Sequence, residues 1–241
     1  MDPRRAIGIS LAALAAASCG GGSGGLPPTP SPAPVRASFD FSMGNGGWLS
    51  GHADYTPATA PTDVVSEIRT LPAPFSGSGY YSAGTNLSDD LFVYVKTKVS
   101  GLTAGVLYRV TAQVQFLTSA PAGCAGVGGP PGESVWVVVG ASPAEPLTVF
   151  DGTYFRINVE RGNQSTSGRD GIVVGTVANT STDCLVRRWE SKTLATPNPS
   201  PLTVSADARG EAWFLVGFDS GFESFSAVYY RSLIVEFTPV P

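Results

Sequence analysis

Apolar and polar residues alternate along much of this chain with a period of two. The clearest stretch is residues 106–118, and residues 91–99 follow the same pattern. In the first stretch one face is apolar and the other polar: Tyr108, Val110, Ala112, Val114 and Phe116 against Arg109, Thr111, Gln113 and Gln115. Successive side chains of a strand point to opposite faces, so the pattern predicts half-buried β-strands.

Two further stretches are apolar on both faces. Residues 134–141 form a continuous apolar run, and residues 212–218 place Trp213 and Leu215 on one face and Phe214, Val216 and Phe218 on the other. This pattern is typical of a central strand that is covered on both sides. A second long apolar strand is expected at residues 228–237, with Asp219 and Glu223 in the loop between the two.

Shorter apolar or alternating segments lie between runs of turn residues. They predict strands at residues 36–41, 64–71, 79–83, 153–159, 172–178, 185–189 and 202–206. No segment has a helical period. About ten to twelve short strands separated by turns indicate an all-β fold, an antiparallel β-sandwich of jelly-roll type.

The turn before the strand at 106–118 carries Leu102, Gly105 and Tyr108. This spacing fits a tyrosine corner, in which the Tyr hydroxyl bonds back to the backbone of the turn. A plain turn followed by a core tyrosine is the alternative.

The first 35 residues predict a leader and a tether rather than a fold. Residues 1–18 combine Arg4 and Arg5 with a short apolar run, as a signal peptide does. Cys19 follows directly, and a Gly- and Pro-rich tether at residues 19–35 precedes a domain at residues 36–241. The run 16–19, Ala-Ala-Ser-Cys, resembles a lipobox, which implies a lipid on Cys19 and export to the cell envelope, with Gly20 favouring the outer membrane. Ordinary cleavage after Ala17 is the alternative.

The low content of charged residues and the negative net charge limit the kinds of molecule that the protein is expected to bind. Of 241 residues, 14% are charged, and the formal net charge is −4. Because binding to a phosphate backbone needs a basic face, nucleic acid is excluded as the expected partner. Gly and Pro are abundant, at 29 and 20 residues, which fits an exported β-protein with many turns.

Cys124 and Cys184 are the two remaining cysteines. Thiols outside the cytosol usually pair, which predicts a disulfide between them. A two-cysteine metal site is the alternative, and it lacks a nearby histidine. The single histidine, His52, has no nucleophile motif around it.

A resemblance to known proteins rests on several short motifs. Phe39-Asp40-Phe41, Gly47-Trp48 and the Leu102–Tyr108 turn resemble jelly-roll carbohydrate-binding modules. A wider set resembles a family of uncharacterised bacterial surface lipoproteins: Ala53-Asp54-Tyr55, Ser88-Asp89-Asp90-Leu91, Gly162-Asn163-Gln164 and Asp219-Ser220-Gly221-Phe222-Glu223. The resemblance to the binding modules implies a structural calcium between the first and last strands, held by Asp40 and Glu236. Solvent-facing positions on their strands are the alternative for both residues.

The candidate ligand-binding residues are acids, amides and aromatics in expected loops or strand ends: Asp54, Tyr55, Tyr81, Asp89, Asp90, Asn163, Gln164, Asp219 and Glu223. Aromatic faces and planar polar groups suit carbohydrate, so the first hypothesis is a lipid-anchored, non-catalytic glycan-binding protein. A structural or adhesive protein that binds another protein is the second. A glycan hydrolase or lyase is the third, because it needs two carboxylates across a cleft.

Overall fold

The structure, a computed structural model, describes residues 32–241. The predicted signal peptide, the lipidation site Cys19 and most of the tether lie outside the described residues. Pro32–Pro241 form one compact unit. In this part of the chain, no helix has the length and apolar character that crossing a membrane requires.

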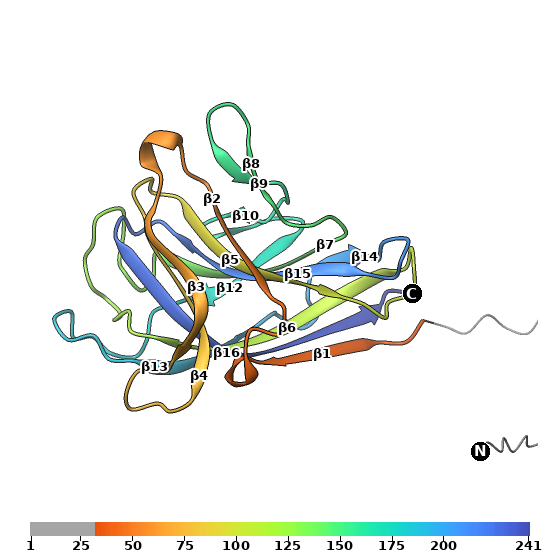
Figure 1. The fold of residues 1–241 in the computed structure, drawn as a ribbon, viewed down its shortest axis with the longest axis horizontal. Coiled ribbons are helices and arrows are strands. Elements are labelled where there is room, and N and C mark those ends of the chain that lie inside the picture. Colours follow the sequence, from red (N-terminus) through yellow and green to blue (C-terminus); the bar gives the residue numbers. More distant parts are fainter. Residues whose placement is uncertain (1–31) are drawn as a thin grey trace, which may run out of the picture. The chain divides into compact units, whose positions relative to one another are not determined.

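Two antiparallel sheets make up the body of this unit, which confirms the predicted all-β sandwich (Figure 1). The seven-stranded sheet has the order β13-β6-β16-β4-β3, with β1 beside β16 and β14 beside β6. Its strands are β1 Val35–Asp40, β3 Thr62–Thr70, β4 Ser78–Thr85, β6 Leu107–Thr118, β13 Glu190–Ala195, β14 Thr203–Ser205 and β16 Phe225–Pro239.

The five-stranded sheet has the order β12-β7-β15-β5-β2. Its strands are β2 Leu49–Ala53, β5 Leu91–Val99, β7 Val135–Ser142, β12 Gly171–Thr176 and β15 Ala212–Ser220. Two small hairpins and two short 3-10 helices complete the described part: β8 Thr148–Phe150 with β9 Phe155–Ile157, β10 Gly162–Asn163 with β11 Thr166–Ser167, η1 Phe41–Met43 and η2 Pro57–Thr59.

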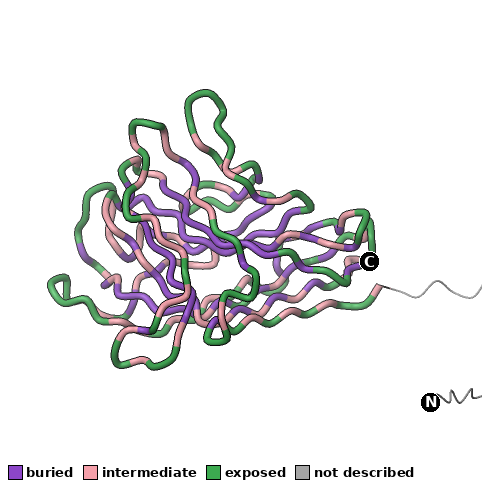
Figure 2. Tube along the Cα trace, in the orientation of Figure 1, coloured by how far each residue is buried: buried purple, intermediate pink, exposed green. Residues whose placement is uncertain are grey.

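The main core lies between the two sheets, and the alternation in the sequence predicts its members correctly. The apolar face of β6, from Tyr108 to Phe116, is buried in it, as are Phe214, Val216 and Phe218 of β15. Leu215 belongs to a second cluster on the outer face of the five-stranded sheet. That strand is therefore covered on both faces, and its buried backbone runs through the middle of the unit in Figure 2.

The tyrosine corner is confirmed. The hydroxyl of Tyr108 accepts a hydrogen bond from the backbone amide of Thr103 at 2.8 Å, and the Tyr108 ring is fully buried. The bond fixes the turn that precedes β6.

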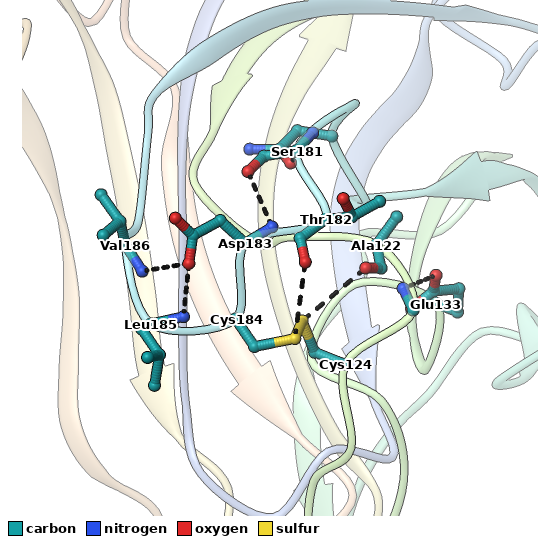
Figure 3. The surroundings of a disulfide bond; sticks show 11 residues. Ala122, Cys124, Glu133, Ser181, Thr182, Asp183, Cys184, Leu185 and Val186 are labelled. Carbon is teal, nitrogen blue, oxygen red and sulfur yellow. Dashed lines mark hydrogen bonds between the residues drawn. A yellow bond between two sulfur atoms is a disulfide. The ribbon is translucent and has the colours of Figure 1, made fainter.

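The disulfide between Cys124 and Cys184 is also confirmed (Figure 3). It joins the loop that follows β6 to the loop that precedes β13. Backbone hydrogen bonds connect the same two loops, from Ala122 to Ser181 at 2.7 Å and from Asn179 to Ala120 at 2.8 Å.

One expected strand and one expected loop position are wrong. Residues 185–189 form a loop, because the Asp183 carboxylate accepts the backbone amides of Leu185 and Val186 and turns the chain. The strand begins after it, at Glu190. In addition, β15 extends to Ser220, so Asp219 lies in a strand and not in the following loop.

The ends of β1 and β16 define the two ends of the sandwich. Val35 pairs with Phe237, so β1 begins where β16 finishes. The other end of β16 pairs with Thr85 and Thr118, near the disulfide-linked loops. Figure 1 shows the start of β1 and the C-terminus together at one end of the sandwich.

Candidate functional site

Three carboxylates from separate segments surround one buried arginine. Asp54 follows β2, Asp90 precedes β5, and Asp219 lies near the end of β15. The Arg161 side chain is 3% exposed; its Nη1 donates to Asp219 and its Nη2 to Asp54, while Asp90 Oδ1 lies 4.0 Å away. The guanidinium carbon lies 4.1 Å from the centre of the Phe92 ring. We call these four charged residues the Arg161 cluster.

The hairpin that follows Arg161 is tied to the same cluster. The backbone amide of Gln164 donates to Asp219 Oδ2 at 2.5 Å, and its side-chain amide donates to the Asp89 carbonyl at 2.7 Å. Five of the predicted site residues are thus brought together: Asp54, Asp89, Asp90, Gln164 and Asp219. Sequence reasoning missed Arg161, which is the residue that connects them.

Three residues in or next to the Arg161 cluster have strained backbone conformations. Asp54, Asp89 and Gln164 have φ angles of 69°, 62° and 50°, in the left-handed region. Non-glycine residues adopt this region at a cost and keep it where surrounding contacts hold them. Here hydrogen bonds to Arg161, Gln164 and Asp219 supply those contacts.

The cluster holds more negative than positive charge. Burial raises the pKa of Asp219, and Arg161 opposes the rise only in part. Burial, followed by the charges of Asp219 and Asp54, raises the pKa of Asp90 to about 7, against the opposing effect of Arg161 and Arg156. Burial lowers the pKa of Arg161, but the charges of Asp219 and Asp54 outweigh burial and raise it overall. Asp90 therefore titrates near neutral pH.

A cavity of about 180 Å³ opens beside the cluster. Its lining includes Asp54, Asp90, Glu160, Arg161 and Asn163. Asp54 is engaged by Arg161, and Glu160 Oε2 accepts the backbone amide of Arg169 at 2.7 Å. A glycoside hydrolase needs two carboxylates acting across a cleft. Only Asp90 has neither a hydrogen bond nor a close ion pair here, so the geometry does not favour that chemistry.

The raised pKa of Asp90 leads to a prediction about stability. The folded state binds a proton at Asp90 up to about pH 7, whereas an unfolded aspartate releases it near 3.8. The unfolding free energy contributed by Asp90 therefore falls as pH rises from about 4 to about 7. We expect Asp90→Asn to be more stable than the native chain at pH 8, by about 1–2 kcal/mol after solvent screening of a side chain 26% exposed.

Urea unfolding at pH 4 and pH 8 checks this expectation. The difference between the two proteins should nearly vanish at pH 4, where Asp90 is protonated in the folded state and about half protonated in the unfolded state. Asp151→Asn, at a half-exposed aspartate of the β8–β9 turn, is a control of opposite sign: backbone amides of Tyr154 and Thr153 lower its pKa, so this variant should lose stability at pH 8 and not gain it. Equal stability of Asp90→Asn and the native chain at pH 8 would contradict the prediction.

A larger groove, of about 480 Å³, runs along the edge strand β2. Residues of both sheets and of the β8–β9 hairpin line it: Ser50, Gly51, His52, Tyr55, Val64, Ser66, Tyr94, Lys96, Leu147 and Thr148. A side chain at Gly51 would place Cβ 2.4 Å from the hydroxyl of Tyr94, so only glycine leaves room for this ring. The Thr148 hydroxyl donates to the His52 carbonyl at 2.7 Å and thereby docks the hairpin onto β2.

An aromatic run extends from this groove along the β8–β9 hairpin. Ring centroids are separated by 5.3 Å for His52 and Tyr55, 5.0 Å for Tyr55 and Phe155, and 4.9 Å for Phe155 and Phe150. The first two pairs are stacked, so the Tyr55 ring packs against both His52 and Phe155 and is half-buried.

The other predicted residues lie elsewhere. Tyr81 is buried on the outer face of the seven-stranded sheet, between Tyr229 and the guanidinium of Arg69. Glu223 is exposed, and Gly128 lies close to both it and Asp89. Asn163 is exposed at the mouth of the smaller cavity.

The predicted calcium pair does not come together. Arg36 pairs with Glu236 and Asp40 with Ser232, so the two acids lie four residues apart along β1 and β16. That spacing corresponds to roughly 13 Å. Asp40 instead accepts the Ser42 amide at 2.9 Å and caps η1. Within residues 32–241, no group of three or more His, Cys, Asp or Glu side chains is arranged to hold a metal ion.

Comparison with known proteins gives limited similarity. No family model and no curated protein matches the chain. The carbohydrate-binding module TmCBM61, solved with β-1,4-galactotriose, is 8% identical with a TM-score of 0.36, over 81% of this chain and 92% of that one. TmCBM27, described for specific mannan recognition, is 9% identical with a TM-score of 0.41, over 84% and 97%.

A cleaved adhesin domain (K1) of Lys-gingipain from Porphyromonas gingivalis is 12% identical, with a TM-score of 0.38 over 86% of this chain and 99% of that one. Similarity at this level assigns neither a ligand nor an activity to this chain.

Proposed function

We propose that this protein is a non-catalytic ligand-binding β-sandwich that holds a neutral glycan in the groove along β2. The main support for this proposal is the lining of that groove, which combines hydroxyl groups and an imidazole with aromatic rings. Sugars present many hydroxyls and apolar ring faces, and sites of this mixed kind complement them. The groove volume of about 480 Å³ also lies in the range of small-ligand sites.

The charge of the groove supports an uncharged ligand. Burial lowers the pKa of His52, so its imidazole is neutral at pH 7 and can both donate and accept. Burial raises the pKa of Tyr55, which keeps its hydroxyl protonated. Lys96 is the one charged residue of the lining, and its ammonium group is already bonded to Glu145 at 2.8 Å and to the Pro146 carbonyl at 2.5 Å.

The location of the protein is a second part of the proposal. A lipid on Cys19, with residues 19–35 as a tether, would hold the domain at the cell envelope, and the sequence of the leader supports this.

Binding measurements with a pair of conservative variants test the function. Isothermal titration of residues 32–241 with neutral gluco- and manno-oligosaccharides should show binding, and anionic uronate polymers should not bind. His52→Phe keeps a ring against Tyr55 but removes both nitrogens, and we expect about 2- to 10-fold weaker binding. Gln113→Ala, exposed on the other sheet, is the control.

Each outcome of that titration bears on the proposal. Equal affinity of His52→Phe and the native chain would place the ligand elsewhere. No binding of any neutral sugar would overturn glycan binding for those sugars. Loss of binding in Gln113→Ala would point instead to the opposite face.

The opposite face favours the second candidate function, binding of another protein. A hollow of about 430 Å³ lies over β1, β6 and β16, and Thr111, Gln113, Glu236 and Arg36 line it. This face carries polar side chains and no aromatic residue in its hollow. Such a surface suits a polar protein interface better than a sugar ring.

A further inference from the structure

The β8–β9 hairpin carries an unusual amount of exposed apolar surface beside the groove. Leu147, Val149, Phe150 and Tyr154 are all exposed within this one hairpin. Strand pairing matches Thr148 with Ile157, Val149 with Arg156 and Phe150 with Phe155. Because side chains alternate along a strand, Phe150 shares a face with Thr148, which lines the groove, while Val149 points the other way.

Phe150 is the open end of the aromatic run. It is 52% exposed, whereas Tyr55 is half-buried and packs against His52 and Phe155. Phe155 supports the inner side of the Phe150 ring at 4.9 Å. The hairpin base is fixed as well, since the amide of Phe155 donates to the Tyr55 carbonyl at 2.8 Å and Tyr94 Oη lies 3.2 Å from Thr148 Oγ1. A ring held in this way loses little freedom when a flat ligand packs on it.

We propose that Phe150 is a second contact point for the same ligand, so that the groove and hairpin together bind an extended chain of several sugar units rather than one sugar. This inference rests on the proposed glycan-binding function. The groove supplies hydrogen bonds to one part of the chain, and Phe150 supplies a stacking face to a neighbouring part. The two surfaces are continuous. Thr148 lines the groove and lies on the same strand as Phe150, and Phe155 packs against both Tyr55 of the groove and Phe150.

The charge of the molecule favours this ligand over a bilayer. The formal net charge is −4, and the hairpin bears Asp151 beside Arg156 at 3.3 Å. A loop that inserts among anionic headgroups would need a surplus of basic residues next to its apolar tip. The hairpin has no such surplus.

The dependence of affinity on chain length tests the inference. Linear β-1,4-linked gluco- and manno-oligosaccharides, from the mono- to the hexasaccharide, would be titrated into the native chain, Phe150→Ala and Val149→Ala. Native affinity should rise with length and then level off. Phe150→Ala should bind the hexasaccharide about 3- to 10-fold more weakly and the shortest bound sugar equally well. Val149→Ala, exposed on the other face of the same strand, should match the native chain.

The possible results distinguish failure of the extended site from failure of the proposed glycan-binding function. Binding of short sugars with no gain in affinity for longer ones would overturn the extended site and leave groove binding intact. An equal loss in Phe150→Ala for all lengths would also overturn it, by indicating a structural role. No binding at any length would overturn both. Sedimentation with phosphatidylglycerol vesicles that Phe150→Ala abolishes would assign the hairpin to a membrane instead.

Discussion

Replacing Arg161 with methionine is expected to lower the unfolding free energy by about 3–5 kcal/mol at pH 7. Arg161 is the one buried cation against the carboxylates of Asp54 and Asp219, which are themselves buried. Methionine keeps much of the side-chain volume over Phe92 but leaves two buried carboxylates without the buried cation that neutralises them. A buried charge that loses its partner costs far more than a surface pair contributes.

Acidic pH should reduce this loss. Without the arginine, the pKa of Asp219 in the folded state rises further, so a proton neutralises this buried carboxylate as pH falls. The difference between Arg161→Met and the native chain should therefore be larger at pH 8 than at pH 5. The triple variant with Asp54→Asn and Asp219→Asn should recover part of the stability at pH 8, because it removes the uncompensated charges.

Urea unfolding followed by circular dichroism measures these differences. Arg156→Met is the matched control: Arg156 is 47% exposed, lies 3.9 Å from Asp54, and should cost less than about 1 kcal/mol when replaced. If Arg161→Met and Arg156→Met lowered the unfolding free energy by the same small amount, the Arg161 cluster would not stabilise the folded protein as expected.

The sandwich could be predicted because a strand with one buried face shows apolar residues at every second position of its own sequence. Each inward residue of β5, β6 and β15 stands two positions from the next, and burial requires each of them to be apolar. The Leu102–Tyr108 corner is equally local, since donor and acceptor are five residues apart. These features needed no knowledge of which strands pair.

The candidate site depends on contacts that sequence does not display. Arg161 and Asp219 are 58 positions apart, and Arg161 and Asp54 are 107 apart. Within its segment, Arg161 resembles any polar loop residue. The one available signal was the excess of acids in neighbouring loops, which requires a cation if they converge. The groove along β2 was missed for a related reason: β2 is Leu-Ser-Gly-His-Ala, which has little apolar alternation.

The strand wrongly expected at residues 185–189 shows how a local pattern can mislead. Leu185 and Val186 are followed by Arg187 and Arg188, and this mixture fits a short strand. In the structure Leu185 is 95% exposed, because Asp183 and the neighbouring disulfide hold the loop in another shape. Apolar residues indicate strands only where the fold has a face to cover them.

Removing the disulfide is the second change with a large expected effect. Cys124 and Cys184 are separated by 60 positions, and the chain-entropy relation for a loop of this length gives about 4 kcal/mol. We expect the double variant Cys124→Ala with Cys184→Ala to lose that amount, or about 8–16 °C in Tm for a domain of this size. The native chain in a reducing agent should behave in the same way.

The loss should come mainly from the unfolded state. The backbone bonds from Ala122 to Ser181 and from Asn179 to Ala120 still join the two loops when the sulfur atoms are gone, so the folded structure should persist. The unfolded chain, freed from a crosslink, expands and exposes more surface. The urea m-value should therefore rise together with the loss of stability. An unchanged m-value with altered circular dichroism of the folded state would contradict this account and would place the effect in the folded loops instead.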